Sequence, residues 1–269
     1  MEKSHTVYST QTKIVRALLV LFLILIAALT LYPLIYIVFG SFKENAELLR
    51  GGTKLLPEKF ILDNYKEAWH KANFARYTFN SIMISVGVMV VTLIATSMAG
   101  YVFARKNFRG KELLYSLFVA FMFVNVGSVT LRPLFELAVK VKMNTSLLSV
   151  ILIAAGTGQA TYIFLSKELD DAAKIDGCTF FQIYYKVILP LLKPILATTG
   201  LLSFRAGWNE YIMPLVFTMS NEKMRPLTVG VTMLKNSGDG TAAWNLMFAG
   251  ATISIIPIVV IYIFTSKQF

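Results

Sequence analysis

Six long apolar segments, separated by polar loops, restrict the folds available to this sequence. They lie at about residues 17–39, 82–104, 113–131, 147–165, 194–216 and 246–264. Each is long enough to cross a hydrocarbon core of roughly 30 Å as a helix that rises about 1.5 Å per residue. The sequence does not alternate over about ten residues, as transmembrane strands would. It therefore predicts an all-α polytopic membrane protein, with six transmembrane helices in one domain covering residues 1–269.

The composition agrees with a membrane protein. Hydrophobic residues make up 56% of the chain and charged residues only 15%, whereas a soluble domain carries about 25% charged residues. The net charge of +11 would suit nucleic acid, but the basic residues flank apolar segments as in cationic membrane loops, so we expect no nucleic-acid partner. The single cysteine, Cys178, excludes a disulfide within the chain. The first segment is too long for a cleaved signal peptide.

The loop between the second and third segments orients the chain. An even number of spans places both termini on one side, and basic residues divide almost equally between the two sides. The very short loop 105–111 nevertheless contains Arg105, Lys106, Arg109 and Lys111. Short loops rich in Lys and Arg stay in the cytoplasm, whereas long connections such as residues 43–78 are translocated regardless of charge. We therefore expect both termini in the cytoplasm.

A polar loop, residues 166–193, separates the fourth and fifth segments. Acidic residues near its start suit the first turn of a short helix, and Gly177 is suited to end that helix. Thr179 and Gln182 have the spacing of a capping box for a second helix, which is expected to stop near Pro190. The pattern predicts a helix–turn–helix on the cytoplasmic surface. It is equally typical of an ordinary amphipathic hairpin at the membrane interface.

This loop resembles the EAA signature of ABC importer permeases. The matching residues are Asp171, Ala172, Ala173, Gly177, Val187, Leu189 and Pro190, with Asp and Val in place of the family's usual Glu and Ile. In that family the loop forms a coupling helix that docks into a cleft of the ATP-hydrolysing subunit. The resemblance implies that the loop couples to the ATPase through Asp171, Ala172, Ala173, Asp176, Gly177, Leu189 and Pro190. The loop departs from the family in following the fourth span at once, without the usual Pro-x pair.

Further motifs, in the right order along the chain, are similar to those of the carbohydrate-type permeases of this family. They are Tyr32–Leu34 with Ser41–Lys43, Asn64-Tyr65, Asn80-Ser81, Gly100–Arg105 with Phe108–Gly110, Asn144-Thr145, and Trp208–Tyr211 with Pro214-Leu215. The resemblance implies a permease subunit of an ATP-driven importer of sugars or oligosaccharides in a bacterial inner membrane. It also implies the partners: a second homologous permease subunit, two ABC ATPase subunits and an external solute-binding protein.

The sequence contains no catalytic pattern. A Walker A motif, a metal-ligand spacing of His and Cys, and a nucleophile–base pair are all absent from it. We therefore expect no catalytic residue, no metal and no cofactor in this chain, and ATP and Mg²⁺ to bind to the partner ATPase subunits.

The fifth segment contains the best candidates for a solute path. Arg205 lies about 18 Å from Lys193 along a helix, near the middle of the membrane, where charged residues are functional candidates. Trp208 and Asn209 follow at helical spacings of three and four, on the same face. Glu210 is also a candidate, although not a good same-face partner of Arg205, and Asn125 in the third segment is a weaker one. An arginine, an amide and an indole suit a polyhydroxyl solute, but they equally suit bonds that hold helices or subunits together.

Two other classes of transporter remain open on this pattern. One is a permease of another ABC importer class, for polyamine or phosphate. The other is an ATP-independent channel or carrier, which inverted repeats with broken helices would favour. The sequence shows no convincing internal repeat.

Overall fold

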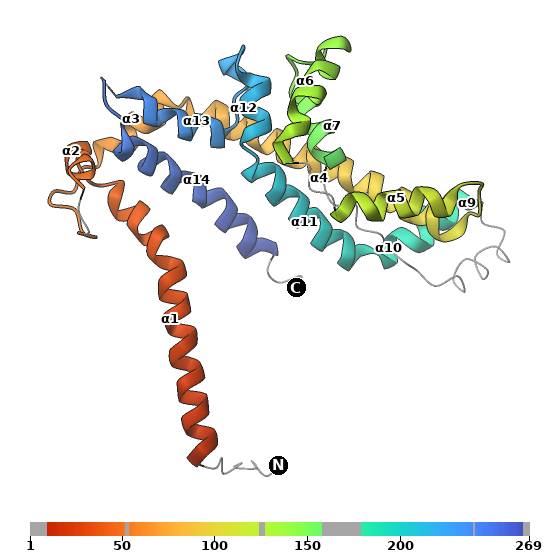
Figure 1. Cartoon of the computed structure of the whole chain (residues 1–269), viewed down its shortest axis with the longest axis horizontal. Helices are drawn as coiled ribbons and strands as arrows, with labels where there is room; N and C mark the ends of the chain where they lie inside the picture. Colours follow the sequence, from red (N-terminus) through yellow and green to blue (C-terminus); the bar gives the residue numbers. More distant parts are fainter. Residues whose placement is uncertain (1–9, 52–53, 124–126, 158–178, 239, 266–269) are drawn as a thin grey trace. The chain divides into compact units, whose positions relative to one another are not determined.

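A computed structural model describes residues 10–51, 54–123, 127–157, 179–238 and 240–265 (Figure 1). Every regular element among these residues is helical, which confirms the all-α prediction. The chain divides into two compact units. One consists of residues 1–68 and 234–253, and the other of residues 69–233 and 254–269.

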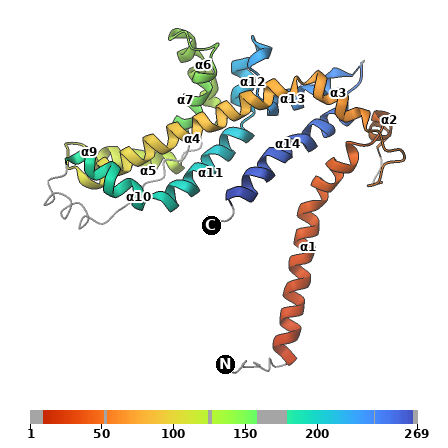
Figure 2. The same cartoon turned by 180° about the vertical axis from the view of Figure 1, so that it is seen from behind.

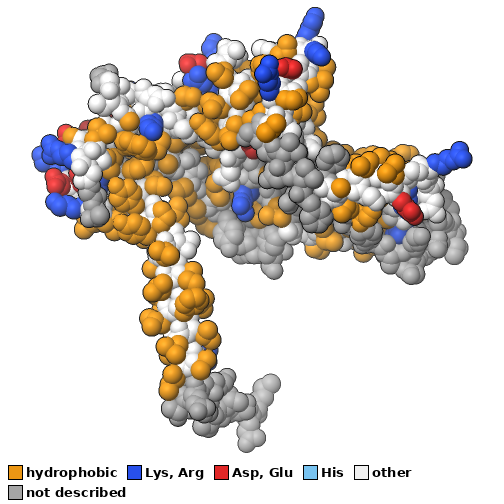
Figure 3. Space-filling model, in the orientation of Figure 1, with side chains coloured by type: hydrophobic (Ala, Val, Ile, Leu, Met, Phe, Trp, Pro, Cys, Tyr) orange, Lys and Arg blue, Asp and Glu red, His pale blue; other side chains and the backbone are white. Residues whose placement is uncertain are grey.

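The first unit begins with α1 (Thr10–Gly40), an apolar helix of 31 residues. Its side chains from residue 14 to residue 35 are all exposed, and hydrophobic side chains cover most of its surface (Figure 3). A helix that is apolar on every side is stable in surroundings that are themselves apolar, such as lipid. The predicted first span, 17–39, lies within α1.

The end of α1 packs against the start of α14 (Trp244–Thr265) inside this unit. Gly40 allows the close approach, because a Cβ atom there would lie 2.6 Å from Cδ2 of Phe248. Asn64, on α3 (Asp63–Lys71), donates from Nδ2 to the carbonyl oxygens of Ser41 and Lys43 at 2.8 and 2.9 Å. Its own Oδ1 accepts from Nδ2 of Asn245 at 2.8 Å. One buried amide thus fixes the turn after α1 to both helices.

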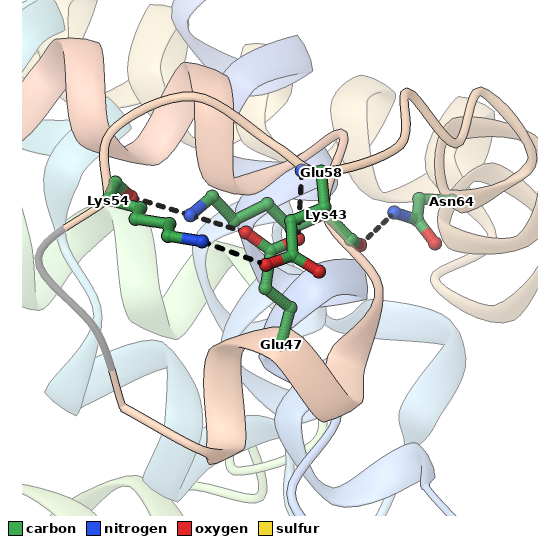
Figure 4. A network of polar contacts seen from close by, with 5 residues as sticks. All are labelled: Lys43, Glu47, Lys54, Glu58 and Asn64. Atoms are coloured by element: carbon green, nitrogen blue, oxygen red, sulfur yellow. Dashed lines mark hydrogen bonds and ion pairs between the residues drawn. The ribbon is translucent and has the colours of Figure 1, made fainter.

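A network centred on Lys43 organises the loop around the short helix α2 (Asn45–Leu49) (Figure 4). The Lys43 ammonium donates to the carbonyl oxygen of Lys54 at 2.6 Å and pairs with Oε1 of Glu47 at 2.9 Å. Oε2 of Glu47 accepts from the backbone N–H of Glu58 at 3.3 Å. Burial raises the pKa of Glu47, but its hydrogen bonds and the Lys43 and Lys54 charges outweigh burial, so the pKa lies below its ordinary value.

We expect Glu47→Gln to destabilise the first unit by about 1–3 kcal/mol, because it leaves the buried Lys43 charge without a counter-ion. The matched control is Glu58→Gln, whose partner is Lys54. The Lys54 and Glu58 side chains are 74% and 62% exposed, against 4% and 16% for Lys43 and Glu47, so the control should cost less than about 1 kcal/mol. Chemical denaturation of the purified protein in detergent measures both variants.

The pH dependence has a defined sign. Because the pKa of Glu47 is lowered in the folded protein, the ionised carboxylate stabilises the folded state at neutral pH. This stabilisation is lost as the pH falls through the lowered pKa. In the Glu47→Gln variant the free energy of unfolding should lack this pH-dependent part, as chemical denaturation at several pH values would show. Equal destabilisation by the two substitutions would contradict the network.

The second unit is built on α4 (Phe74–Arg105), with α11 (Lys193–Asn209) and α7 (Leu147–Thr157) packed along it (Figures 1 and 2). Gly207 allows α11 to approach closely, because a Cβ atom there would lie 3.0 Å from Cα of Ser85. The core also includes α6 (Leu131–Lys140) and α12 (Ile212–Thr218). Its buried residues are Ile84, Val88, Ala138, Val150, Ile151, Met213 and Phe217.

Two predicted spans are not single helices. The predicted third span, 113–131, covers α5 (Lys111–Phe123), a 3₁₀ turn η1 (Gly127–Thr130) and the first residue of α6. Gly127 has a low helix propensity, which favours an interruption there. The predicted fifth span, 194–216, is broken between α11 and α12, where Glu210 is extended with φ −64° and ψ 129°. Hydropathy finds apolar segments but does not detect such breaks.

Three described helices are long and apolar enough to cross a membrane: Ile14–Gly40, Phe74–Arg105 and Trp244–Ile261. A fourth results if Phe180–Leu191 and Lys193–Asn209, which are bent by 78°, form one span. In the fourth predicted span, 147–165, α7 is described only to Thr157. The count of six spans therefore remains a prediction.

Candidate functional site

The second helix of the predicted coupling loop begins with the expected capping box. The N–H of Thr179 donates to Oε1 of Gln182 at 2.8 Å, and the N–H of Gln182 donates to Oγ1 of Thr179 at 3.4 Å. The helix continues as α9 (Phe180–Gln182), a π-helical turn η2 (Ile183–Ile188) and α10 (Leu189–Leu191). We call Phe180–Leu191 the docked segment.

Val187, Leu189 and Pro190 are the described members of the EAA-like motif, and Pro190 lies within α10, one residue before the helix ends. A proline ring clashes with the carbonyl four residues back, and Lys186 at that position belongs to the π turn. The wider π turn is one way in which a helix accommodates such a clash. Five other predicted coupling residues lie outside the described residues: Asp171, Ala172, Ala173, Asp176 and Gly177.

The docked segment packs against the last turns of α4. Ile183 and Ile188 are buried together with Tyr101 and Leu192. The hydroxyl of Tyr184 lies 2.7 Å from Oγ of Ser97, and the ring centroids of Tyr101 and Phe180 are 4.7 Å apart. The segment that follows the EAA-like alanines is therefore fixed to α4 by a mixed apolar and polar contact.

Arg205 and Asn209, the first pair of solute-path candidates, lie together on an exposed face near the end of α11. The side-chain amide of Asn209 donates from Nδ2 to the carbonyl oxygen of Arg205 at 3.0 Å. This bond uses the amide nitrogen of Asn209, and the amide oxygen takes no part in it. The two side chains are placed as the helical spacing predicts.

Trp208 differs from its neighbours because its side chain is only 3% exposed. Its ring stacks on Phe204 with centroids 6.0 Å apart and planes 19° apart. In this conformation the indole forms part of the packing of α11, and a large aromatic residue in such a position contributes to stability through its buried area. Whether Trp208 contacts solute remains a prediction.

Glu210 occupies the break between α11 and α12. Its Oε1 accepts from the N–H of Met213 at 3.3 Å, in the first turn of α12, where a negative charge is favourable. Its carbonyl oxygen accepts from Oγ1 of Thr228 at 2.9 Å, on α13 (Leu227–Met233). Glu210 therefore stabilises the break between α11 and α12. Asn125 lies outside the described residues.

Sequence reasoning marked Asn80-Ser81 as a motif without assigning it a role, and the structure supplies one. Nδ2 of Asn80 donates to the carbonyl oxygens of Lys223 and Arg225 at 2.9 and 3.0 Å. Oγ of Ser81 accepts from the N–H of Leu227 at 2.8 Å. These bonds hold the turn before α13 against α4. They join residues 143 to 146 positions apart in the sequence, so no local pattern reveals them.

Among the described residues, no group of three or more His, Cys, Asp or Glu side chains is placed to hold a metal ion.

The chain belongs to the family of binding-protein-dependent transport system inner membrane components, which matches residues 94–267. This membership confirms the prediction of an importer permease in the inner membrane.

Several relatives are transport permeases. The chain is 34% identical over 254 residues to the arabinooligosaccharides transport system permease protein AraQ of Halalkalibacterium halodurans, covering 91% of this chain and 89% of that protein. It is 30% identical over 271 residues to AraQ of Bacillus subtilis, with coverages of 97% and 95%. It is also 30% identical over 252 residues to the probable starch degradation products transport system permease protein AmyC of Thermoanaerobacterium thermosulfurigenes, with coverages of 91% and 90%.

The fold has a close counterpart among solved structures. A chain in the crystal structure of a bacterial ABC transporter involved in the import of the acidic polysaccharide alginate superposes with a TM-score of 0.78. The superposition covers 97% of this chain and 99% of that chain, at 24% sequence identity.

We expect Asn209→Ala to lower solute transport several-fold while assembly with partner subunits stays normal, because its side chain is exposed and bonds only within α11 among the described residues. Asn236→Ala, an exposed asparagine outside α11, is the control. Uptake of labelled solute by proteoliposomes measures both.

Arg205→Leu separates the two roles left open for Arg205, which are lining a solute path and holding a helix or subunit interface. If Arg205 lines the solute path, the substitution should change which solutes are preferred. If Arg205 holds an interface, the substitution should release a partner subunit during purification. Loss of assembly with unchanged preference would contradict the path.

Proposed function

We propose that this chain is a membrane-spanning permease subunit of an ATP-driven importer, and that its solute is a sugar or oligosaccharide delivered by an external solute-binding protein. The observation that carries the proposal is the family membership together with relatives named for oligosaccharide transport. These relatives favour a sugar over the polyamine or phosphate of other ABC importer classes. They also favour an ATP-driven importer over an ATP-independent carrier.

The proposed complex contains a second homologous permease subunit and two ABC ATPase subunits that bind ATP and Mg²⁺. The loop 166–193 is proposed to couple this chain to one ATPase subunit. The described capping box at Thr179 and the packing of the docked segment on α4 support this role, because a loop that transmits force needs a rigid attachment to the spans. We assign no catalytic residue to this chain.

The proposed topology has six spans, with both termini in the cytoplasm. The basic loop 105–111, directly after α4, supports it. Two exposed asparagines provide a matched test in a Cys178→Ser background: Asn236→Cys should react with an impermeant thiol reagent in intact cells, and Asn107→Cys only after lysis. The opposite labelling pattern would refute the orientation.

Co-expression with the cognate ATPase, second permease and solute-binding subunits tests the function directly. We expect the purified complex in proteoliposomes to hydrolyse ATP faster when the liganded binding protein is added. Ala173→Glu should abolish this stimulation but leave membrane insertion intact, since a charge buried in a partner cleft costs several kcal/mol. Glu168→Ala, which lies outside the EAA-like residues, is the control. Full stimulation in Ala173→Glu would contradict the coupling role, and absence of any ATPase partner would contradict the function.

A further inference from the structure

Two side chains of α4, those of Ser97 and Tyr101, contact the docked segment, and so does Lys106, the residue after the helix. Ser97 contacts the hydroxyl of Tyr184 at 2.7 Å. The ring of Tyr101 lies 4.7 Å from that of Phe180 and 5.3 Å from that of Tyr184, between centroids. The ammonium of Lys106 lies 4.6 Å from the Phe180 ring centroid. Because Ser97 and Tyr101 are four residues apart, they face the docked segment on successive turns.

The direction of the Ser97–Tyr184 hydrogen bond follows from the geometry. Oγ of Ser97 lies 2.6 Å from the carbonyl oxygen of Leu93, one turn back in α4. A serine hydroxyl has a single hydrogen, so Ser97 donates to Leu93 and accepts from Tyr184. This hydrogen bond is partly buried, and a hydrogen bond in such surroundings is stronger and more costly to lose than one in water.

Beyond this contact, α4 is packed closely against α11 (Figure 2). A Cβ atom at Gly200 would lie 3.3 Å from Cδ1 of Leu93, and one at Gly207 would lie 3.0 Å from Cα of Ser85. The two helices therefore approach closely at these two glycines, and packed interfaces of this kind do not deform continuously. Leu93 connects the two contacts, because its carbonyl oxygen binds Ser97 and its side chain faces Gly200.

The covalent route from the docked segment to α11 is bent. The axes of Phe180–Leu191 and Lys193–Asn209 differ by 78°. Pro194 lies in the first turn of α11, where its fixed φ and missing N–H suit a helix start. A displacement of the docked segment therefore does not continue along one straight helix into α11, whereas the contact with α4 gives it a packed route.

We propose that Tyr184, positioned by Ser97 and Tyr101, transmits movement of the docked segment to α4 and, through the Gly200 and Gly207 contacts, to α11. This inference rests on the proposed coupling function of the loop 166–193. Tyr184 is a positioning residue, which acts by keeping the docked segment and α4 together as one body. Without its hydroxyl bond, the loop still engages the ATPase, but its movement is only partly transferred to the spans.

Tyr184→Phe tests the link, because it removes the hydroxyl and keeps the ring contact with Tyr101. The complete importer in proteoliposomes supplies the readout, which is solute transported per ATP hydrolysed. We expect this ratio to fall roughly 2- to 30-fold, as for changes of 0.5–2 kcal/mol in coupling, with unchanged subunit composition. Tyr185→Phe is the matched control: its side chain is half exposed, and no hydrogen bond to its hydroxyl occurs in the described part of the chain.

Ser97→Ala removes the same hydrogen bond from the other side. If one bond carries the effect, the double variant Ser97→Ala/Tyr184→Phe should transport no less per ATP than Tyr184→Phe alone. Losses that add would show that the two hydroxyls act independently and would overturn the proposed link.

Two further results would also overturn it. One is a transport ratio in Tyr184→Phe equal to that of Tyr185→Phe. The other is a lowered thermal stability of the complex with an unchanged ratio, which would make the contact purely structural. A failure of the proposed function itself is distinguishable, since the unsubstituted complex would then show no ATP hydrolysis stimulated by the liganded binding protein.

Discussion

The second unit depends on how α4 satisfies polar groups inside an apolar helix. In lipid an unpaired polar group is costly, so hydroxyls must find partners within the protein. Ser85, Thr96 and Ser97 each donate to the carbonyl oxygen four residues back, at 2.7, 2.8 and 2.6 Å. Small, internally bonded side chains of this kind allow neighbouring helices to approach closely. Ser85 lies at the contact of α4 with Gly207 of α11, and Ser97 lies at its contact with Tyr184 of the docked segment, so these small polar residues occur where α4 meets both.

Features encoded by neighbouring residues could be predicted from the sequence, whereas those that depend on distant residues could not. The capping box joins Thr179 and Gln182, three residues apart, and its spacing alone predicts the two hydrogen bonds found. The bond between Ser97 and Tyr184 joins residues 87 apart, so no local pattern reveals it. The long apolar helices α1, α4 and α14 were found for the same local reason, since an uninterrupted apolar segment identifies itself.

The fifth span shows where hydropathy and helical spacing are insufficient. Arg205, Trp208 and Asn209 share a face by spacing, yet Trp208 is buried against Phe204 while the other two are exposed. Which side chains of α11 are buried depends on where the neighbouring helices pack, and helical spacing alone does not give that arrangement. The break at Glu210 is likewise set by its hydrogen bonds to Met213 and Thr228. A carboxylate that appears in the sequence as a charge within a span accepts, in the structure, a hydrogen bond from the first turn of the next helix.

The length of α4 has a mechanical consequence. Its 32 residues extend for about 48 Å at 1.5 Å per residue, whereas the hydrocarbon core is only about 30 Å thick. Unless it is strongly tilted, the helix projects beyond the lipid by several turns. Ser97 and Tyr101 belong to its last three turns, and Lys106 directly follows its last residue. Tyrosine and lysine are the residues that tolerate the boundary between lipid and water. A rigid helix that projects beyond the lipid acts as a lever. A small lateral displacement of its projecting end therefore tilts the whole helix within the membrane.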